Sequence, residues 1–276
     1  MKTFIKQFIP PVLVSVLKKK QTVEEPQSMW SGNYNSWSDV MQHCKGYDDE
    51  LILEKCKNAL LKVKNGEAVY ERDSVLFAEK EYSTGLLTVL EKAALQDKKL
   101  CVLDFGGSLG SSYYQNKEML SDINALQWCV VEQLHFVEAG KKYFEDEQLK
   151  FYTSIEECLQ IQQPNVILLS GVLQYLEKPF DWLEKFIKLG VEYFVLDRTA
   201  FITKEEDLLT VQNVPESIYK ASYPAWFFNE EKLISKFQNH YEILFVQTDF
   251  TNSKINIANT TAAWKIAAFK KKKSLA

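Results

Sequence analysis

From residue 100 onward, short hydrophobic runs alternate with stretches of helical spacing. The runs predict strands at Leu100–Phe105, Gln127–Glu132, Leu149–Tyr152, Val166–Ser170, Tyr193–Asp197, Tyr241–Gln247 and Ala262–Phe269. Val166–Leu169 and Tyr193–Leu196 are continuously apolar, which is typical of parallel strands covered on both faces. Strands that alternate with helices predict a doubly wound, mostly parallel seven-stranded α/β sheet, with these two runs as central strands.

The last two predicted strands are separated by a polar stretch, Thr248–Thr261, that has no apolar helical face. Parallel neighbours need a crossover connection, usually a helix, so we expect an antiparallel hairpin to close the sheet. Upstream, Asp48–Lys62 and Ser74–Leu95 have helical spacing. We therefore predict an N-terminal arm and linker over residues 1–27, a helical extension over 28–97 and the sheet domain over 98–276.

The composition limits which partners the protein can bind and indicates its cellular compartment. The chain has 276 residues and a formal net charge of −4, so we expect no nucleic-acid partner. Five cysteines are an odd number and are scattered along the chain, which indicates reduced thiols and a cytoplasmic location. The cysteines and the three histidines form no ligand spacing, so we expect no metal site.

The N-terminal arm contains an apolar segment, Phe8–Leu17, that is too short to span a bilayer. It includes Pro10 and Pro11 and is followed by lysines rather than by a small-residue cleavage site, so it is not a typical signal peptide. Two interpretations stay open. Residues 1–20 either pack on protein or lie peripherally on an anionic inner-membrane surface.

Candidate chemistry begins where the first predicted strand ends. The strand leads into an acid and a glycine-rich turn, followed by the helical pattern of Ser111–Leu120. The residues of this turn are Asp104, Gly106, Gly107, Ser108 and Gly110. Glycines allow a sharp turn and close approach of a ligand, and a helix start offers unpaired N–H groups. The turn predicts a site for a nucleotide-type cofactor.

A second acid supports an adenosine-containing cofactor. Glu132 ends the second predicted strand, and the spacing from Gly110 is close to the ~20 residues expected for an acid that bonds ribose hydroxyls. Leu169–Pro179 then supplies an apolar run after the fourth strand, ending in a proline that we expect to open a helix.

From Lys99 to the C-terminus the chain resembles the class I methyltransferases that use S-adenosylmethionine. Val102–Gly110 resembles their first motif, with Ser108 where the common form has glycine, and Leu169–Pro179 resembles their fourth strand and following loop. The whole chain resembles a narrower group of methyltransferases found among bacterial surface-polysaccharide and lipopolysaccharide biosynthesis proteins. The segments that carry this second resemblance are Trp30–Tyr34, Gly46–Asp48, Glu71–Phe77, Asp104–Tyr114 and Val131–Gln133.

The resemblance implies a Rossmann-like methyltransferase fold, S-adenosylmethionine as cofactor, and an enzyme that methylates a hydroxyl of a sugar or other small molecule. The acceptor would be a small molecule or a glycan of surface-polysaccharide biosynthesis. The implied cofactor-binding residues are Asp104, Gly106, Gly107, Ser108, Gly110, Glu132, Gln133, Thr153, Ser154, Ser170, Gly171 and Val172. Thr153 and Ser154 stand at the end of the third strand, where the family often has an acid against the adenine amino group.

Methyl transfer to a hydroxyl needs alignment of the acceptor and a group that takes its proton. Our candidates for catalysis are Asp197, Tyr175 and His135, with His43 as a further base. For acceptor binding, charge and flat aromatic faces favour Glu71, Arg72, Trp30 and Tyr34.

Two other classes of protein stay open. A non-catalytic binding protein with a cofactor-type fold would explain Ser108 and the missing adenine acid. An NAD-dependent oxidoreductase would use the same glycine turn, but its sheet would continue with parallel strands where we expect the closing hairpin.

Overall fold

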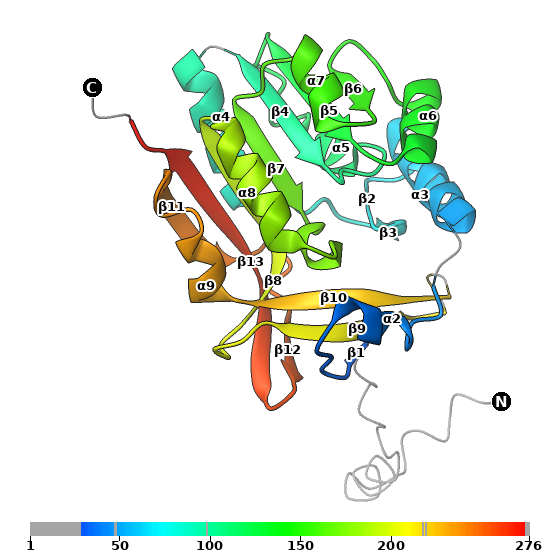
Figure 1. Cartoon of the computed structure of the whole chain (residues 1–276). Coiled ribbons are helices and arrows are strands. Elements are labelled where there is room, and N and C mark those ends of the chain that lie inside the picture. The colour runs from blue at the N-terminus through cyan, green and yellow to red at the C-terminus, as the bar shows by residue number, and fades with distance from the viewer. Residues whose placement is uncertain (1–28, 47–48, 98, 217, 219, 274–276) are drawn as a thin grey trace, which may run out of the picture.

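The computed structural model describes residues 29–46, 49–97, 99–216, 218 and 220–273 (Figure 1). The predicted arm and linker at 1–27 lie outside these residues. The main sheet has the spatial strand order β6, β5, β4, β7, β8, β13, β11. The strands are β4 (Leu100–Phe105), β5 (Leu126–Val131), β6 (Leu149–Tyr152), β7 (Val166–Ser170), β8 (Tyr193–Ile202), β11 (Tyr241–Thr248) and β13 (Thr260–Lys271).

The predicted fold class is confirmed. Strands β4 to β8 pair in parallel, whereas β13 pairs antiparallel with both β8 and β11. The closing hairpin is therefore present, and the parallel continuation of a dinucleotide-type oxidoreductase is not. Strand β8 extends to Ile202, beyond its predicted end at Asp197, because its outer part remains paired with β13, where Ile202 faces Ala262.

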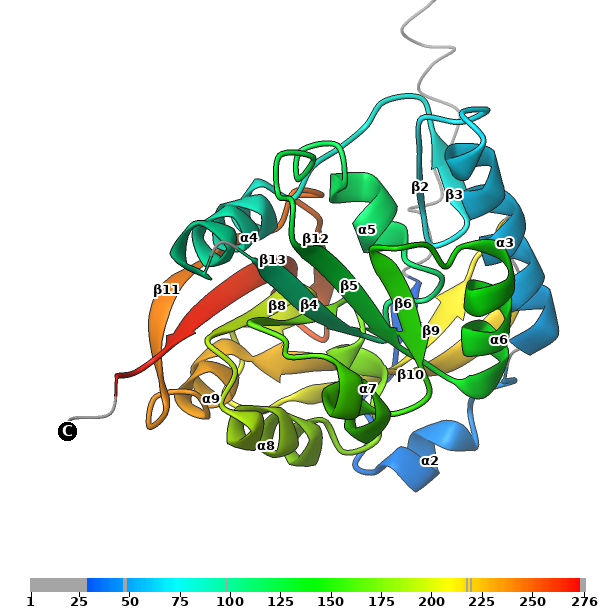
Figure 2. The same cartoon turned by 90° about the horizontal axis from the view of Figure 1, so that it is seen from above.

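Helices cover both faces of the sheet (Figures 1 and 2). One face is covered by α3 (Asp49–Lys64), α4 (Thr84–Asp97), α5 (Ser111–Asn116) and α6 (Leu134–Tyr143), and the other by α7 (Ile155–Ile161), α8 (Pro179–Leu189) and α9 (Glu230–Ser235). Successive strand residues point to opposite faces, so Leu100 and Val102 join one core cluster while Cys101 and Leu103 join the other. Helix α8 begins at Pro179, as predicted.

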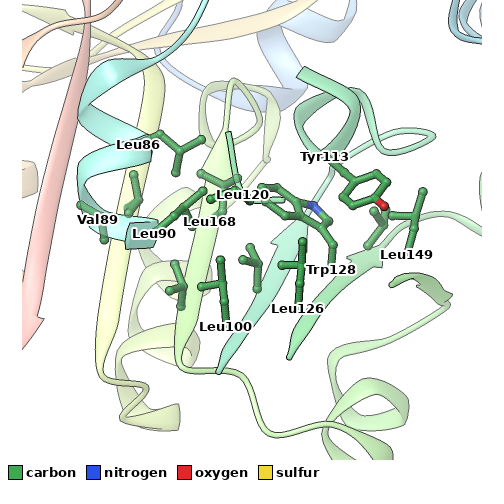
Figure 3. Packing of buried hydrophobic residues seen from close by; sticks show 14 of the residues in the cluster. Leu86, Val89, Leu90, Leu100, Tyr113, Leu120, Leu126, Trp128, Leu149 and Leu168 are labelled. Atoms are coloured by element: carbon green, nitrogen blue, oxygen red, sulfur yellow. The ribbon is translucent and has the colours of Figure 1, made fainter. Parts of the chain in front are cut away.

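The first core cluster ties α4 to the sheet. Leu86 and Leu90 of α4 lie against Leu100 and Leu168 of the sheet, and Trp128 lies farther from α4, followed by Tyr113 and Leu149 (Figure 3). All of these side chains are buried. Helix α4 thus contributes directly to the core of the sheet, and the proposed boundary at residues 97 and 98 stays a prediction.

A second, antiparallel sheet forms around two strands inserted in the chain between β8 and α9. These strands, β9 (Leu208–Val214) and β10 (Ala221–Asn229), are joined by β1 (Trp30–Ser31), which precedes the main sheet in the chain. Helix α2 (Trp37–Met41) packs against this inserted sheet (Figure 1). The end of β10 pairs with the end of β8, which joins the two sheets. Tyr223–Phe228 lies within β10, where antiparallel pairing with β9 accommodates Pro224 inside the strand.

Two further hairpins were not predicted. Strands β2 (Tyr70–Arg72) and β3 (Val75–Phe77) form a tight hairpin whose turn residues, Asp73 and Ser74, have φ of 51° and 69°. The predicted helical start at Ser74 is therefore wrong, and α4 begins at Thr84. A short run such as Val75–Phe77 fits both periodicities, and the left-handed turn decides between them. Strand β12 (Lys254–Ile257) pairs with the start of β13.

Within the described part of the chain, no helix has the length and hydrophobicity needed to cross a membrane. The same residues contain no group of three or more His, Cys, Asp or Glu side chains placed to hold a metal ion.

Candidate functional site

The glycine-rich turn lies at the carboxyl ends of the parallel strands, directly after β4. Gly106, Ser108 and Gly110 have φ of 71°, 54° and 93°. Ser108 thus adopts the left-handed backbone conformation that glycine favours. The tight turn therefore forms with serine in place of the usual glycine. At Gly106 the requirement for glycine is steric as well, because a Cβ there would lie 2.4 Å from Cγ2 of Val172.

Glu132 connects the end of β5 to this turn. Its Oε1 accepts a hydrogen bond from the backbone N–H of Ser108 at 3.3 Å, and its Oε2 accepts one from the N–H of Gln133 at 2.7 Å. Burial raises the pKa of the Glu132 carboxyl. Each carboxylate oxygen retains a further lone pair, so Glu132 can also accept two hydroxyl groups from a ligand.

Asp104 lies beneath the turn and is fully buried. Its Oδ2 accepts the indole N–H of Trp128 at 2.9 Å, whereas its Oδ1 has no hydrogen-bond partner among the described residues. Burial raises the pKa of Asp104 to about 7. A Cβ at Gly107 would lie 2.5 Å from Oδ2, so the carboxyl group packs directly against the turn.

The end of β6 is arranged around the start of α7. The N–H and the hydroxyl of Thr153 both donate to Oε2 of Glu157 at 2.7 Å, and Oγ of Ser154 accepts the N–H of Glu157 at 3.0 Å. Both predicted hydroxyls therefore serve the helix start. An acid does reach the end of β6, but from the following helix. Sequence reasoning missed it, although Ser-x-x-Glu is the spacing of a capping box.

A buried polar network joins the ends of β7 and β8. Ser170 donates to Oδ2 of Asp197 at 3.0 Å, and Ser83 donates to Oδ1 at 3.3 Å. Nε of Arg198 donates to Oγ of Ser170 at 3.2 Å. Burial raises the pKa of Asp197. Asp197 is only 2% exposed and each of its oxygens accepts a serine hydroxyl, so proton exchange with an acceptor would run through one of these serines.

Gly171 follows Ser170 with φ of 68°, and its N–H donates to the carbonyl of Asp197 at 2.9 Å. The loop then enters the 3-10 helix η2 (Leu173–Tyr175). The Tyr175 hydroxyl donates to Oε1 of Gln212 at 3.0 Å, and its ring meets that of Tyr223 edge-on at 5.3 Å. Tyr175 therefore lies where the parallel sheet meets the inserted sheet.

His135 stands apart from these residues. It lies in the first turn of α6, after β5, whereas Tyr175 and Asp197 follow or end strands β7 and β8. Strands β4 and β7 separate β5 from β8, a distance of about 14 Å across the sheet. The structure does not bring His135 together with the other two candidates for catalysis.

The predicted acceptor-binding residues are divided between two places. Trp30 packs against Phe227 and Trp264, with ring centroids 5.9 and 5.0 Å away. The Tyr34 ring packs against His43 at 4.8 Å. These aromatic residues belong to the packing of the inserted sheet.

Glu71 and Arg72 instead lie on the β2–β3 hairpin. Glu71 is only 3% exposed, and its Oε2 accepts the N–H of Ser74 at 3.2 Å. Arg72 pairs with Glu81 at 3.2 Å and lies over the ring of Phe77 at 4.7 Å. Glu71 and Arg72 are thus the two of the four residues predicted to bind the methyl acceptor that lie on the hairpin facing α5.

A cavity of about 430 Å³ lies at the opposite edge of the sheet, before β7 and β8. It is lined by residues such as Gln162, Asn165 and Lys271 and includes none of the predicted site residues.

No known protein-family model and no curated protein matches the chain. Solved structures show limited similarity. A S-adenosylmethionine-dependent methyltransferase from Methanosarcina mazei matches 64% of this chain and 93% of its own, with 11% identity and a TM-score of 0.44. The magnesium protoporphyrin IX methyltransferase ChlM of Synechocystis, crystallised with bound S-adenosylmethionine, matches 83% and 99%, with 14% identity and a TM-score of 0.41.

LepI in complex with S-adenosylmethionine matches 66% of this chain, with 10% identity and a TM-score of 0.42, and this chain spans only 46% of the length of LepI. Similarity of this extent carries no conclusion about cofactor, substrate or activity. The fold stands on the strand pairing itself.

Proposed function

We propose that the protein transfers a methyl group from S-adenosylmethionine to a hydroxyl of a sugar or other small molecule in bacterial surface-polysaccharide biosynthesis. The observation that carries the proposal is the turn after β4, with its left-handed residues, hydrogen-bonded to Glu132 at the end of β5. This pair lies in a parallel sheet closed by an antiparallel strand. The sugar and the pathway rest on the sequence resemblance alone.

The residues at the carboxyl edge fit the chemical groups of S-adenosylmethionine. The turn at Gly106–Gly110 permits close approach, and Glu132 retains lone pairs for the ribose hydroxyls. The unpartnered Oδ1 of Asp104 offers a buried acceptor to a positively charged group. The chain therefore presents an acceptor for both the neutral hydroxyls and the cationic part of this cofactor.

When bound, the cofactor supplies an electrophilic methyl group on a positively charged sulfur. The protein would align the acceptor and remove its proton. Val172 packs over Gly106 at the turn. Ser170 lies between Arg198 and Asp197, so Oγ can take the acceptor's proton while its own proton passes to Oδ2 of Asp197. Burial raises the pKa of Asp197, which makes it a better proton acceptor.

Calorimetric titration with S-adenosylmethionine, S-adenosylhomocysteine and NAD tests the cofactor. We expect both sulfur compounds to bind and NAD not to. Glu132→Ala should abolish binding, because it removes the ribose contacts at a strand end and no core atoms. Glu138→Ala, an exposed position on α6, is the matched control and should bind like the wild type. Binding of NAD, or unchanged affinity in Glu132→Ala, contradicts the proposal.

The acceptor is tested by incubating the protein with labelled S-adenosylmethionine and a panel of free and nucleotide-linked sugars. We expect label on a sugar hydroxyl. Methylation of non-sugar compounds alone would overturn the sugar proposal. Cofactor binding without transfer to any acceptor would favour the non-catalytic interpretation.

A further inference from the structure

The β2–β3 hairpin places a buried carboxyl group beside the glycine-rich turn from outside the parallel sheet. The hairpin lies next to α3 and α5 (Figure 2), and α5 is the helix that follows the turn. Within the hairpin, Glu71 is only 3% exposed. Its Oε2 accepts the N–H of Ser74 at 3.2 Å, and the nearby side chain of Ser111, the first residue of α5, lowers the pKa of the carboxyl.

The second oxygen of Glu71 is unused. Oε1 is buried and has no hydrogen-bond partner among the described residues. A buried acceptor without a partner is costly, and more so when it carries charge. Glu71 is thus oriented by the N–H of Ser74 at one oxygen and lacks a donor at the other, which indicates that a ligand supplies it.

One guanidinium is shared among several acids near this site. Burial raises the pKa of four carboxyls, Glu71, Asp104, Asp197 and Asp249, and the charge of Arg198 offsets part of that rise in each. The same guanidinium also pairs with Asp73 at 3.1 Å. Arg198 therefore interacts with five acidic side chains, and this arrangement favours a positively charged ligand group near them.

We propose that Glu71 binds the positively charged methionine end of S-adenosylmethionine, so that the hairpin completes the cofactor site. This inference rests on the proposed function. The α-ammonium has three N–H donors, and Oε1 of Glu71 accepts one of them. Glu71, which the sequence predicted to bind the methyl acceptor, is thereby assigned to the cofactor site.

Binding of a cation should displace a proton. Burial raises the pKa of Glu71 to about 7, as it does for Asp104. The groups facing Glu71 are Cys56 of α3, Asp73 of the hairpin turn, Ser111 of α5 and Arg198 of β8. A cation binds the ionised carboxyl, so affinity should rise as pH increases through 7 and fall as the carboxyl takes up its proton.

The experiment is calorimetric titration of S-adenosylhomocysteine, which carries the ammonium but no sulfonium, at pH 7 in phosphate and in Tris. The dependence of the observed enthalpy on buffer ionisation measures proton release. We expect the wild type to release about half a proton more than Glu71→Gln, since a group with that pKa is half protonated at pH 7. Any release from Asp104, whose pKa is also about 7, is common to both proteins.

Glu71→Gln should weaken S-adenosylhomocysteine binding roughly 10- to 100-fold, because it removes a charge-assisted hydrogen bond. It should also reduce proton release. Methylthioadenosine, which lacks the amino-acid end, should bind the variant and the wild type equally. Glu79→Gln, an exposed position in the same segment, is the matched control and should leave all three quantities unchanged.

The outcomes separate the two proposals. Equal affinity of the wild type and Glu71→Gln for S-adenosylhomocysteine, or binding by the wild type without proton release, overturns the role of Glu71 alone. Equal weakening of methylthioadenosine shows a purely structural role and also overturns it. Failure of the wild type to bind either sulfur compound overturns the proposed function and this inference together.

Discussion

At the scale of single residues, the turn after β4 shows two ways to hold a left-handed backbone. Ser108 carries a side chain at φ of 54°, and its N–H bonds to Glu132. Gly106 has no such freedom, because Val172 occupies the space that a Cβ would need. The left-handed backbone therefore accepts a side chain at Ser108 but requires glycine at Gly106.

Gly106→Ala should destabilise the protein by roughly 2–4 kcal/mol and weaken S-adenosylhomocysteine binding, because strain and a clash with Val172 add together. Gly66→Ala is the matched control. Gly66 has a similar φ of 75°, and a Cβ there would meet nothing within 4 Å, so only about 1 kcal/mol should be lost. Urea denaturation measures both losses.

A second substitution checks the cause. Adding Val172→Ala to Gly106→Ala removes the closer contact, 2.4 Å to Cγ2, but leaves the Cβ of residue 172 at 2.9 Å and the backbone strain, so it should recover part of the lost stability. Equal losses in Gly106→Ala and Gly66→Ala would show that Val172 plays no part.

At the scale of elements, the β2–β3 hairpin is attached to the sheet by side chains rather than by strand pairing. Asp73 in its turn pairs with Arg198 of β8 at 3.1 Å, and Arg72 pairs with Glu81 at 3.2 Å. The Asp73 side chain is 69% exposed, so its ion pair adds little to global stability. Its effect is to hold the hairpin in place.

Asp73→Asn should therefore speed hydrogen exchange of the hairpin amides while lowering the free energy of unfolding by less than about 1 kcal/mol. Asn tolerates the left-handed turn, so the substitution tests the charge and not the backbone. Asp122→Asn, an exposed position before β5, should change neither quantity. Exchange rates like those of the wild type would mean that the ion pair does not fix the hairpin.

The elements also show where sequence patterns succeed. Long apolar runs and a proline-led helix start identify β7, β8 and α8, because their periodicity is local. Short strands such as β2 and β3 carry too few residues for a period. Their pairing depends on a turn in which two residues without glycine's freedom adopt positive φ.

At the scale of the whole molecule, two sheets meet beside the candidate site. The end of β10 pairs with β8, and the indole N–H of Trp226 donates to the carbonyl of Leu176 at 3.2 Å, just after η2. Trp226 also stacks on Trp37 of α2 at 6.5 Å. The inserted sheet is thus positioned against the loop that carries Tyr175.

Trp226→Phe should lower the free energy of unfolding by about 1 kcal/mol, because it removes this hydrogen bond and keeps an aromatic ring. Affinity for S-adenosylhomocysteine should stay unchanged, since the residues proposed to hold it belong to the parallel sheet and the β2–β3 hairpin. Chemical denaturation and calorimetry measure the two quantities. A loss of affinity would place the inserted sheet in the cofactor site.

The sequence by itself determined the seven strands of the main sheet and their order along the chain, the closing hairpin, and the positions of the glycine-rich turn and Glu132 after β4 and β5, because each depends on local periodicity or on spacing along the chain. Only the tertiary structure decided which polar groups meet. Ser83 and Asp197 are 114 residues apart and hydrogen-bonded, and Asp73 reaches Arg198 from a hairpin that no pattern predicted. Such contacts form when packing brings distant segments together, and burial then sets the charge state of Glu71 and Asp104.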